Sequence, residues 1–242
     1  MIKIMLCNPP ADESYEDPHI HHYTPSLGLM ALKTYLESIL EVDILFVDGD
    51  LEGIEKIKNE LKKFKPDFFG TSDLLVSHMN NLKLHSLAKD LGSKTIIGGH
   101  NATHLAREII SNNPFVDFVI MGDGEKALEE VVRGTNPSQI KNLAFRIGTE
   151  VIVNQRENLP ESFLLPINYR GIDMQGYFNS FRKTQKDPKI KVKNYQRIYS
   201  HKGCANRSNS QGCVFCGRAD IGVRFKNPES YLQELIYLQE EI

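Results

Sequence analysis

Three of the four cysteines in this chain lie within thirteen consecutive residues, at Cys204, Cys213 and Cys216. Thiolates gathered on one loop bind soft metal ions or iron–sulfur clusters. A structural zinc site normally takes four protein ligands, so three thiolates leave one coordination position for a non-protein ligand. We therefore interpret this segment as a soft-metal or iron–sulfur site with one open position. The fourth cysteine, Cys7, lies inside an apolar run and is predicted to be a small buried hydrophobe.

The first 135 residues alternate between short apolar runs and amphipathic segments. The apolar runs predict buried strands at residues 2–7, 42–47, 67–71, 95–97 and 116–121. A period of 3.6 residues predicts helices at 27–40, 51–64, 79–91, 105–110 and 125–132. Strands alternating with helices predict an α/β fold, a doubly wound, Rossmann-like parallel sheet with helices on both faces.

Small and polar residues follow the predicted strands, at the edge where such sheets bind ligands. Paired glycines let the backbone approach a large ligand closely, and hydroxyl groups can donate hydrogen bonds to it. One such segment alone would indicate a tight turn, whereas four segments at the same edge favour a ligand site. The candidate cofactor-binding residues are Thr71, Ser72, Gly98, Gly99, His100, Gly122, Gly124 and Glu125.

An ordered set of short motifs resembles a known family. The motifs are Asn8-Pro9-Pro10, Leu27-Gly28-Leu29, the segment 96–103 with its Gly-Gly-His-Asn-Ala-Thr core, and the segment 116–125. Their order and spacing resemble the cobalamin-binding domain that precedes radical S-adenosylmethionine enzymes, with Asp123 where that family usually has glutamate. The resemblance covers about residues 1 to 135, and it implies cobalamin as a cofactor at the candidate residues.

The resemblance leaves the axial ligand of cobalt open. The chain lacks the Asp-x-His-x-x-Gly motif with which many cobalamin proteins supply a histidine, so we expect binding without a protein axial ligand. His100 could face the corrin or simply be a turn residue. His19, His21 and His22 follow the first strand, where a solvent-exposed loop is the favoured interpretation over metal ligation.

The cysteine segment is similar to the same family but departs from it in one spacing. The family usually holds a 4Fe–4S cluster with Cys-x3-Cys-x2-Cys, whereas here the first gap is eight residues, 205–212, which could loop out. The resemblance implies that Cys204, Cys213 and Cys216 bind the cluster and that its open iron binds S-adenosylmethionine. It also implies that Phe215 packs against the adenine, although an anchoring role in the loop is an equal alternative.

The domain organisation is predicted in three parts. A cobalamin-binding domain at 1–135 is followed by a hairpin and linker at 136–195 and by the start of a radical S-adenosylmethionine domain at 196–242. A first barrel strand is expected at about 197–200 and a helix after Asn227-Pro228-Glu229. Few residues follow the cysteines, so we expect only the start of a partial (β/α) barrel, in a truncated chain.

The resemblance also implies a reaction. The parent enzyme is expected to transfer a methyl group from methylcobalamin to an unactivated carbon or phosphorus centre of a small-molecule or peptide substrate. An electron donor such as flavodoxin or ferredoxin is implied as a partner. Cyclisation or rearrangement is an alternative on the same scaffold. A different class also stays open, a non-catalytic corrinoid- or nucleotide-binding module with a zinc-bound cysteine loop.

Composition and charge limit the classes of binding partner and the compartment that we expect. The formal net charge of −2 gives no electrostatic reason to expect nucleic acid. No apolar run reaches the ~18 to 20 residues of a membrane span, and the first residues lack a signal-peptide layout. Unpaired cysteines suit a reducing compartment, so a cytoplasmic protein without a membrane partner is expected.

Overall fold

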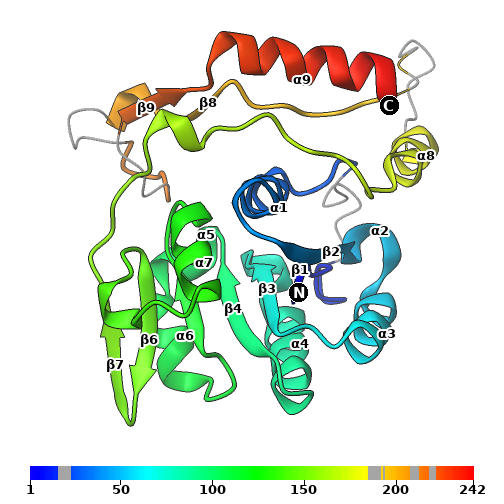
Figure 1. Cartoon of the computed structure of the whole chain (residues 1–242). Helices are drawn as coiled ribbons and strands as arrows, with labels where there is room; N and C mark the ends of the chain where they lie inside the picture. Colours follow the sequence, from blue (N-terminus) through cyan, green and yellow to red (C-terminus); the bar gives the residue numbers. More distant parts are fainter. Residues whose placement is uncertain (16–22, 185–191, 193, 208–212, 218–221) are drawn as a thin grey trace.

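The main body of the computed structural model is a seven-stranded sheet flanked by helices (Figure 1). The structure describes residues 1–15, 23–184, 192, 194–207, 213–217 and 222–242. The strand order is β2-β1-β3-β4-β5-β6-β7. The strands are β1 (Ile2–Asn8), β2 (Val42–Asp48), β3 (Phe68–Ser72), β4 (Lys94–Gly98), β5 (Phe118–Ile120), β6 (Leu143–Ile147) and β7 (Glu150–Val153). The first five are parallel, which confirms the predicted α/β sheet.

Both faces of this sheet are buried under helices. The helices α1 (Leu27–Ile39) and α7 (Glu125–Val132) pack on one face, and α3 (Ile54–Phe64), α4 (His78–Asp90) and α6 (Ala106–Asn112) pack on the other. Successive side chains of β1 alternate between the two cores: Ile4 and Leu6 join the first, and Met5 and Cys7 join the second. Cys7 is fully buried, as predicted, and burial raises the pKa of its thiol.

The strand order reverses beside β1, which pairs with β2 on one side and with β3 on the other. The connection from β1 therefore leads to β2 on one side, whereas the connection from its neighbour β3 leads to β4 on the other side. In sheets of this order, 2-1-3-4-5, a crevice opens at the carboxyl ends of the strands at this point. The topology thus places the loops after β3, β4 and β5 around one opening.

One predicted helix is divided in the structure, and another is preceded by a short helix that was not predicted. The helix predicted at 51–64 is α2 (Gly49–Glu52) followed by α3, because Gly53 between them adopts φ +80°, outside the helical region. The helix predicted at 105–110 is α6, and a further short helix, α5 (His100–His104), precedes it. His100 and Asn101 therefore begin a helix instead of continuing the turn after β4.

The segment predicted as a linker contributes to the main body. Its hairpin is confirmed as β6 and β7, but β6 pairs antiparallel with β5, so the hairpin extends the sheet. The same segment contains α8 (Met174–Thr184), which the sequence prediction missed. Met174, Tyr177 and Phe178 are buried on one face of α8, and their spacing of three and one residues is the helical signal that was available.

The last described elements form a separate two-stranded sheet and a helix. β8 (His201–Cys204) pairs antiparallel with β9 (Gly222–Phe225), and α9 (Pro228–Glu241) follows. Figure 1 shows α9 and this hairpin lying across the edge of the α/β body. A first barrel strand was predicted at 197–200, but the strand in this part of the chain is β8 at 201–204, and its partner β9 is antiparallel. The start of a radical S-adenosylmethionine barrel is therefore not confirmed.

The start of α9 agrees with the prediction. Asn227 caps the helix by accepting a hydrogen bond from the Glu229 backbone N–H, and Pro228 occupies the first turn. A buried ion pair, Lys226 Nζ to Glu234 Oε2 at 2.5 Å, then ties α9 to the end of β9. Among the described helices, none has the length and apolar character required to cross a membrane.

Candidate cofactor-binding site

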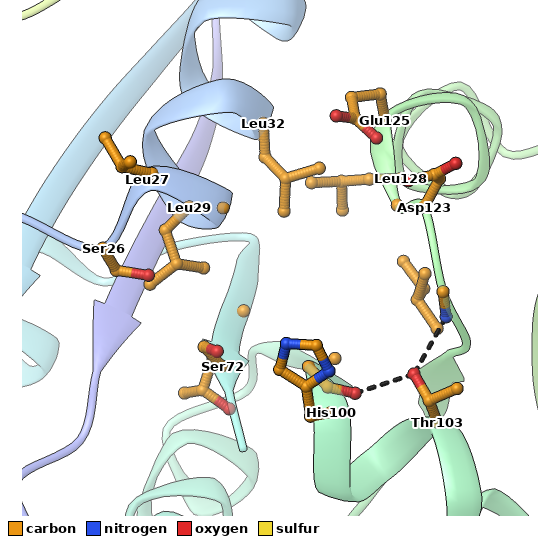
Figure 2. Close-up of a pocket in the computed structure, with 18 of the residues that line it drawn as sticks. Ser26, Leu27, Leu29, Leu32, Ser72, His100, Thr103, Asp123, Glu125 and Leu128 are labelled. Atoms are coloured by element: carbon orange, nitrogen blue, oxygen red, sulfur yellow. Dashed lines mark hydrogen bonds between the residues drawn. The ribbon is translucent and has the colours of Figure 1, made fainter. Parts of the chain in front are cut away.

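A cleft of about 490 Å³ opens at the carboxyl ends of the parallel strands (Figure 2). It is bordered by the loops after β3, β4 and β5 and by the first turns of α1 and α7. The structure brings all the candidate cofactor-binding residues to this cleft, although they come from three separate loops. They are Thr71, Ser72, Gly98, Gly99, His100, Gly122, Gly124 and Glu125.

One wall of the cleft is apolar and the opposite wall is polar. Leu27, Leu29 and Leu32 from α1 line the cleft together with Leu128 from α7, and Figure 2 shows Leu32 and Leu128 side by side, across the cleft from His100 and Thr103. Such a lining suits a large ligand with apolar faces and a polar periphery. The sequence prediction missed these leucines as lining residues, since their helical spacing is that of a core face; the Leu27-Gly28-Leu29 motif was the available signal.

Gly99 shapes the polar wall. Its φ is +100°, and a Cβ atom added there would lie 2.8 Å from the backbone nitrogen of Asp73 and 2.9 Å from its carbonyl oxygen. The Thr103 hydroxyl donates a hydrogen bond to the Gly99 carbonyl at 2.8 Å and accepts one from the Gly122 N–H at 2.9 Å (Figure 2). These contacts fix the turns after β4 and β5 relative to each other, so the glycine backbone borders the cleft in a defined position.

Only one of the two hydroxyls at the end of β3 faces the cleft. The Thr71 hydroxyl donates to Asn81 Oδ1 at 2.6 Å and lies 2.8 Å from His85 Nε2, both in the fully buried interior. It is therefore engaged beneath the cleft and does not point to a ligand, contrary to the expectation for both hydroxyls. Ser72 lies at the cleft itself, where Figure 2 shows its side chain opposite the leucines.

A buried carboxylate supports this polar wall from below. Asp73 is completely buried, and it accepts hydrogen bonds from Asn81 Nδ2 at 2.8 Å and from Asn101 Nδ2 at 2.7 Å. His78 Nδ1 lies 2.9 Å from the same carboxylate. A buried charge needs such partners, because leaving it unpaired would cost several kcal/mol. The network joins the loop after β3 to α4 and α5.

His85 is buried beside this network and packs against Phe69 at 4.9 Å between ring centroids. Burial without a charged partner lowers the pKa of His85 to about 3. The imidazole is therefore neutral at neutral pH, where it can share a hydrogen bond with the Thr71 hydroxyl.

The acidic end of the cleft meets cations from the second sheet. Lys202 Nζ lies 2.7 Å from Glu125 Oε1 and 3.6 Å from Asp123 Oδ1. Arg224 pairs with the Asp123 carboxylate and donates to the Leu159 carbonyl at 2.7 Å. Glu125 thus lines the cleft while bound to Lys202. The sequence prediction missed both cations, because nothing local in β8 or β9 indicates contact with a loop about a hundred residues earlier.

The cysteine loop lies next to the cleft but does not form a metal site in the described residues. Cys204 and Cys216 are half-buried, Cys213 is exposed, and all three thiols are free. His104, which lines the cleft, contacts the Gly217 carbonyl oxygen just after the last of these cysteines. Across the part of the chain that the structure describes, no group of three Cys, His, Asp or Glu side chains could hold a metal ion.

The predictions for Phe215 and for the histidines after the first strand are not tested by the structure. Phe215 is 88% exposed on the cysteine loop, so its packing against a ligand stays a prediction. His19, His21 and His22 lie outside the described residues. His100 lines the cleft at the first turn of α5.

Comparison with known proteins identifies the domain that contains this cleft. Residues 19–132 match the model of the B12 binding domain family. The chain carries a B12-binding domain. The match confirms the resemblance found in the motifs, and it spans α1 to α7 with every candidate cofactor-binding residue.

Three curated relatives each match about half of the chain. An anaerobic magnesium-protoporphyrin IX monomethyl ester cyclase of Cereibacter sphaeroides is 26% identical over 121 residues, which are 46% of this chain and 20% of the relative. An uncharacterized methyltransferase of Pyrococcus horikoshii is 26% identical over 136 residues, 54% of this chain and 29% of the relative. A cyclase of the same name from Rubrivivax gelatinosus is 21% identical over 112 residues, 45% of this chain and 20% of the relative. The chain thus spans less than a third of the length of these relatives.

The position of Gly99 in the B12-binding domain generates a stability prediction. We expect Gly99→Ala to lower the free energy of unfolding by about 2 kcal/mol, because the new Cβ atom would clash with the Asp73 backbone in a left-handed conformation. Gly28→Ala is the matched control, since nothing lies within 4 Å of its Cβ position. Urea unfolding measures both variants; an equal loss in the two would contradict this account of Gly99.

The buried His85 generates a pH prediction. Its pKa is about 3 in the folded state and about 6.5 in the unfolded chain, so between these values the unfolded state binds more protons. Its contribution to stability is complete above about pH 6.5 and falls as the pH drops, by up to about 1.4 kcal/mol per pH unit. Urea unfolding from pH 7 to 4.5 should therefore show a weaker pH dependence in His85→Gln, which cannot titrate. Parallel curves for variant and wild type would exclude this role.

Proposed function

We propose that the cleft of the B12-binding domain binds cobalamin. One observation carries this proposal: residues selected from separate sequence motifs all line one cleft, and most of the residues that line it lie within the segment that matches the B12 binding domain family. An apolar wall of leucines faces a wall of glycine backbone and small polar groups, which matches the two kinds of surface that a corrin presents.

Different residues of the cleft would contact different parts of such a ligand. Leu29, Leu32 and Leu128 would pack against the ring, and the backbone at Gly98 and Gly122 would approach the ligand without an intervening Cβ atom. Ser72 would donate a hydrogen bond at the periphery. When bound, cobalamin would supply a cobalt centre able to carry a methyl group. We keep the proposal that no protein side chain ligates the cobalt.

We further propose that the chain is part of a cobalamin-dependent radical S-adenosylmethionine enzyme that transfers a methyl group to an unactivated carbon or phosphorus centre. Three free thiols on one loop beside the cleft support this class, and a relative named as a methyltransferase supports the reaction. Two relatives named as cyclases favour a second candidate, ring closure on the same scaffold. The substrate would be a small molecule or a peptide, with flavodoxin or ferredoxin as electron donor.

The first test concerns ligand binding in the cleft. We expect hydroxocobalamin to bind the chain at micromolar concentrations and Gly28→Phe to weaken binding at least about tenfold, because the open space beside Gly28 belongs to the cleft. Absorbance titration or equilibrium dialysis measures the affinity. Ser38→Phe is the matched control, since Ser38 is exposed on the same helix, α1, away from the cleft.

Two outcomes would contradict the binding proposal. If Gly28→Phe binds hydroxocobalamin as tightly as wild type, the ligand occupies another surface. If wild type binds none at micromolar concentrations, the domain has lost the function of its family.

The second test concerns the cysteines. After anaerobic reconstitution with iron and sulfide, we expect about four irons per chain and an absorption spectrum that responds to S-adenosylmethionine. Cys204→Ser, Cys213→Ser and Cys216→Ser should each lose iron, whereas Cys7→Ala should retain it, because Cys7 is buried in the sheet. One bound zinc ion in place of the cluster would instead support a non-catalytic module with a zinc-bound loop. Full iron binding by Cys204→Ser would remove Cys204 from the ligand set.

A further inference from the structure

Two cations face each other across the hairpin that carries Cys204. Lys202 in β8 and Arg224 in β9 are direct partners in the antiparallel register, so both side chains project from the same face. Like charges directly opposite each other destabilise a strand pair, and an isolated two-stranded sheet is marginally stable at best. The hairpin therefore needs a compensating surface.

The B12-binding domain provides that surface as a pair of carboxylates. Asp123 lies in the loop before α7, and Glu125, two residues later, is the first residue of that helix. Arg224 pairs with Asp123, while Lys202 reaches both carboxylates at 3.6 and 2.7 Å. The side chains of Asp123, Glu125 and Arg224 are only 11%, 3% and 13% exposed. Ion pairs this shielded from water are weakly screened by salt, and charge-assisted hydrogen bonds are stronger than neutral ones.

The hairpin backbone transmits this attachment to the cysteine. Gly203 lies between Lys202 and Cys204 with φ +99°, and a Cβ atom there would lie 2.1 Å from the Gly222 carbonyl oxygen. The two strands therefore approach each other closely beside Cys204. Because Cys204 is only two residues from Lys202 in the same strand, the position of Lys202 also fixes the position of Cys204. The contact of His104 with the Gly217 carbonyl is a second attachment, at the other end of the cysteine loop.

We propose that Lys202 and Arg224 are positioning residues that latch the cysteine-bearing hairpin onto Asp123 and Glu125. The latch holds Cys204 at the mouth of the cleft, and it joins the hairpin to a residue, Glu125, that itself lines the cleft. Occupation of the cleft and docking of the hairpin are therefore coupled, and the coupling acts in both directions. The latch is inferred from the ion pairs alone, whereas its coupling to cobalamin rests on the proposed function.

Hydrogen exchange of the whole 242-residue chain tests the latch. We expect backbone amides of β8 and β9 to exchange about tenfold faster in Lys202→Met and in Glu125→Gln, because each variant removes one side of the pair. The double variant should exchange no faster than the faster single variant, since the interaction can be lost only once. Amides of β1 and β3 serve as the internal reference, and unchanged exchange there shows that the domain remains folded.

Lys141→Met is the matched control. Lys141 also pairs with a glutamate, Glu157, at 2.6 Å, but both side chains are about half exposed. Its removal should leave the exchange of β8 and β9 unchanged. Wild-type exchange of the hairpin in Lys202→Met, or fully additive effects in the double variant, would overturn the latch.

Hydroxocobalamin tests the coupling. At saturating hydroxocobalamin, the amide exchange of β8 and β9 should slow at least about threefold in wild type. Because the coupling is reciprocal, Lys202→Met should weaken hydroxocobalamin binding by the same factor. Binding without any change in hairpin exchange would overturn the coupling. If wild type binds no hydroxocobalamin, the proposed function and the coupling both fail, while the exchange of the ligand-free variants still decides the latch.

Discussion

Burial of both faces of a parallel sheet is the constraint on which the rest of this structure depends. Alternate residues of β1 enter two different cores, so every strand of the parallel part must be apolar on both sides. Helices must then cover each face, and the chain can change faces only at the ends of the strands. The reversal of strand order beside β1 is where these connections separate. The cleft is thus a consequence of packing, because polar and glycine-rich loops collect at the carboxyl ends of the strands, where the chain changes faces.

The cleft is held in shape by groups that do not reach a ligand. Asp73 is buried beneath the wall formed by Ser72 and Gly99, and its partners come from α4 and α5. The absence of a side chain at Gly99 allows the loop after β4 to pass within contact distance of Asp73. Rigid support of this kind lowers the conformational entropy that a ligand must remove on binding. The residues that face the cleft can therefore be small, because the polar network below them fixes their positions.

The hairpin of β8 and β9 is joined to this domain by charge, whereas α8 and α9 pack with α1 in a hydrophobic cluster. Lys202 and Arg224 meet Asp123 and Glu125 at the cleft, and a second, fully buried pair, Lys226 with Glu234, secures α9 to the same hairpin. A hairpin of four residues in each strand buries little apolar surface. Ionic contacts with defined geometry therefore set its orientation, and breaking one partner of a shielded pair is costly because the other charge stays behind.

Local patterns in the sequence were sufficient for the parallel sheet, most of its covering helices, the hairpin at 143–153 and the small and polar residues that line the cleft at the ends of the strands. These features follow from periodicity, turn chemistry and the rule that such sheets bind ligands at the carboxyl ends of their strands, all of which act over a few residues. Other features depend on partners far along the chain. The hairpin joined the edge of the main sheet, the Thr71 hydroxyl turned inward to His85, and Glu125 met Lys202, 77 residues away. No local pattern specifies such contacts, because their free energy exists only once the fold has brought both partners together.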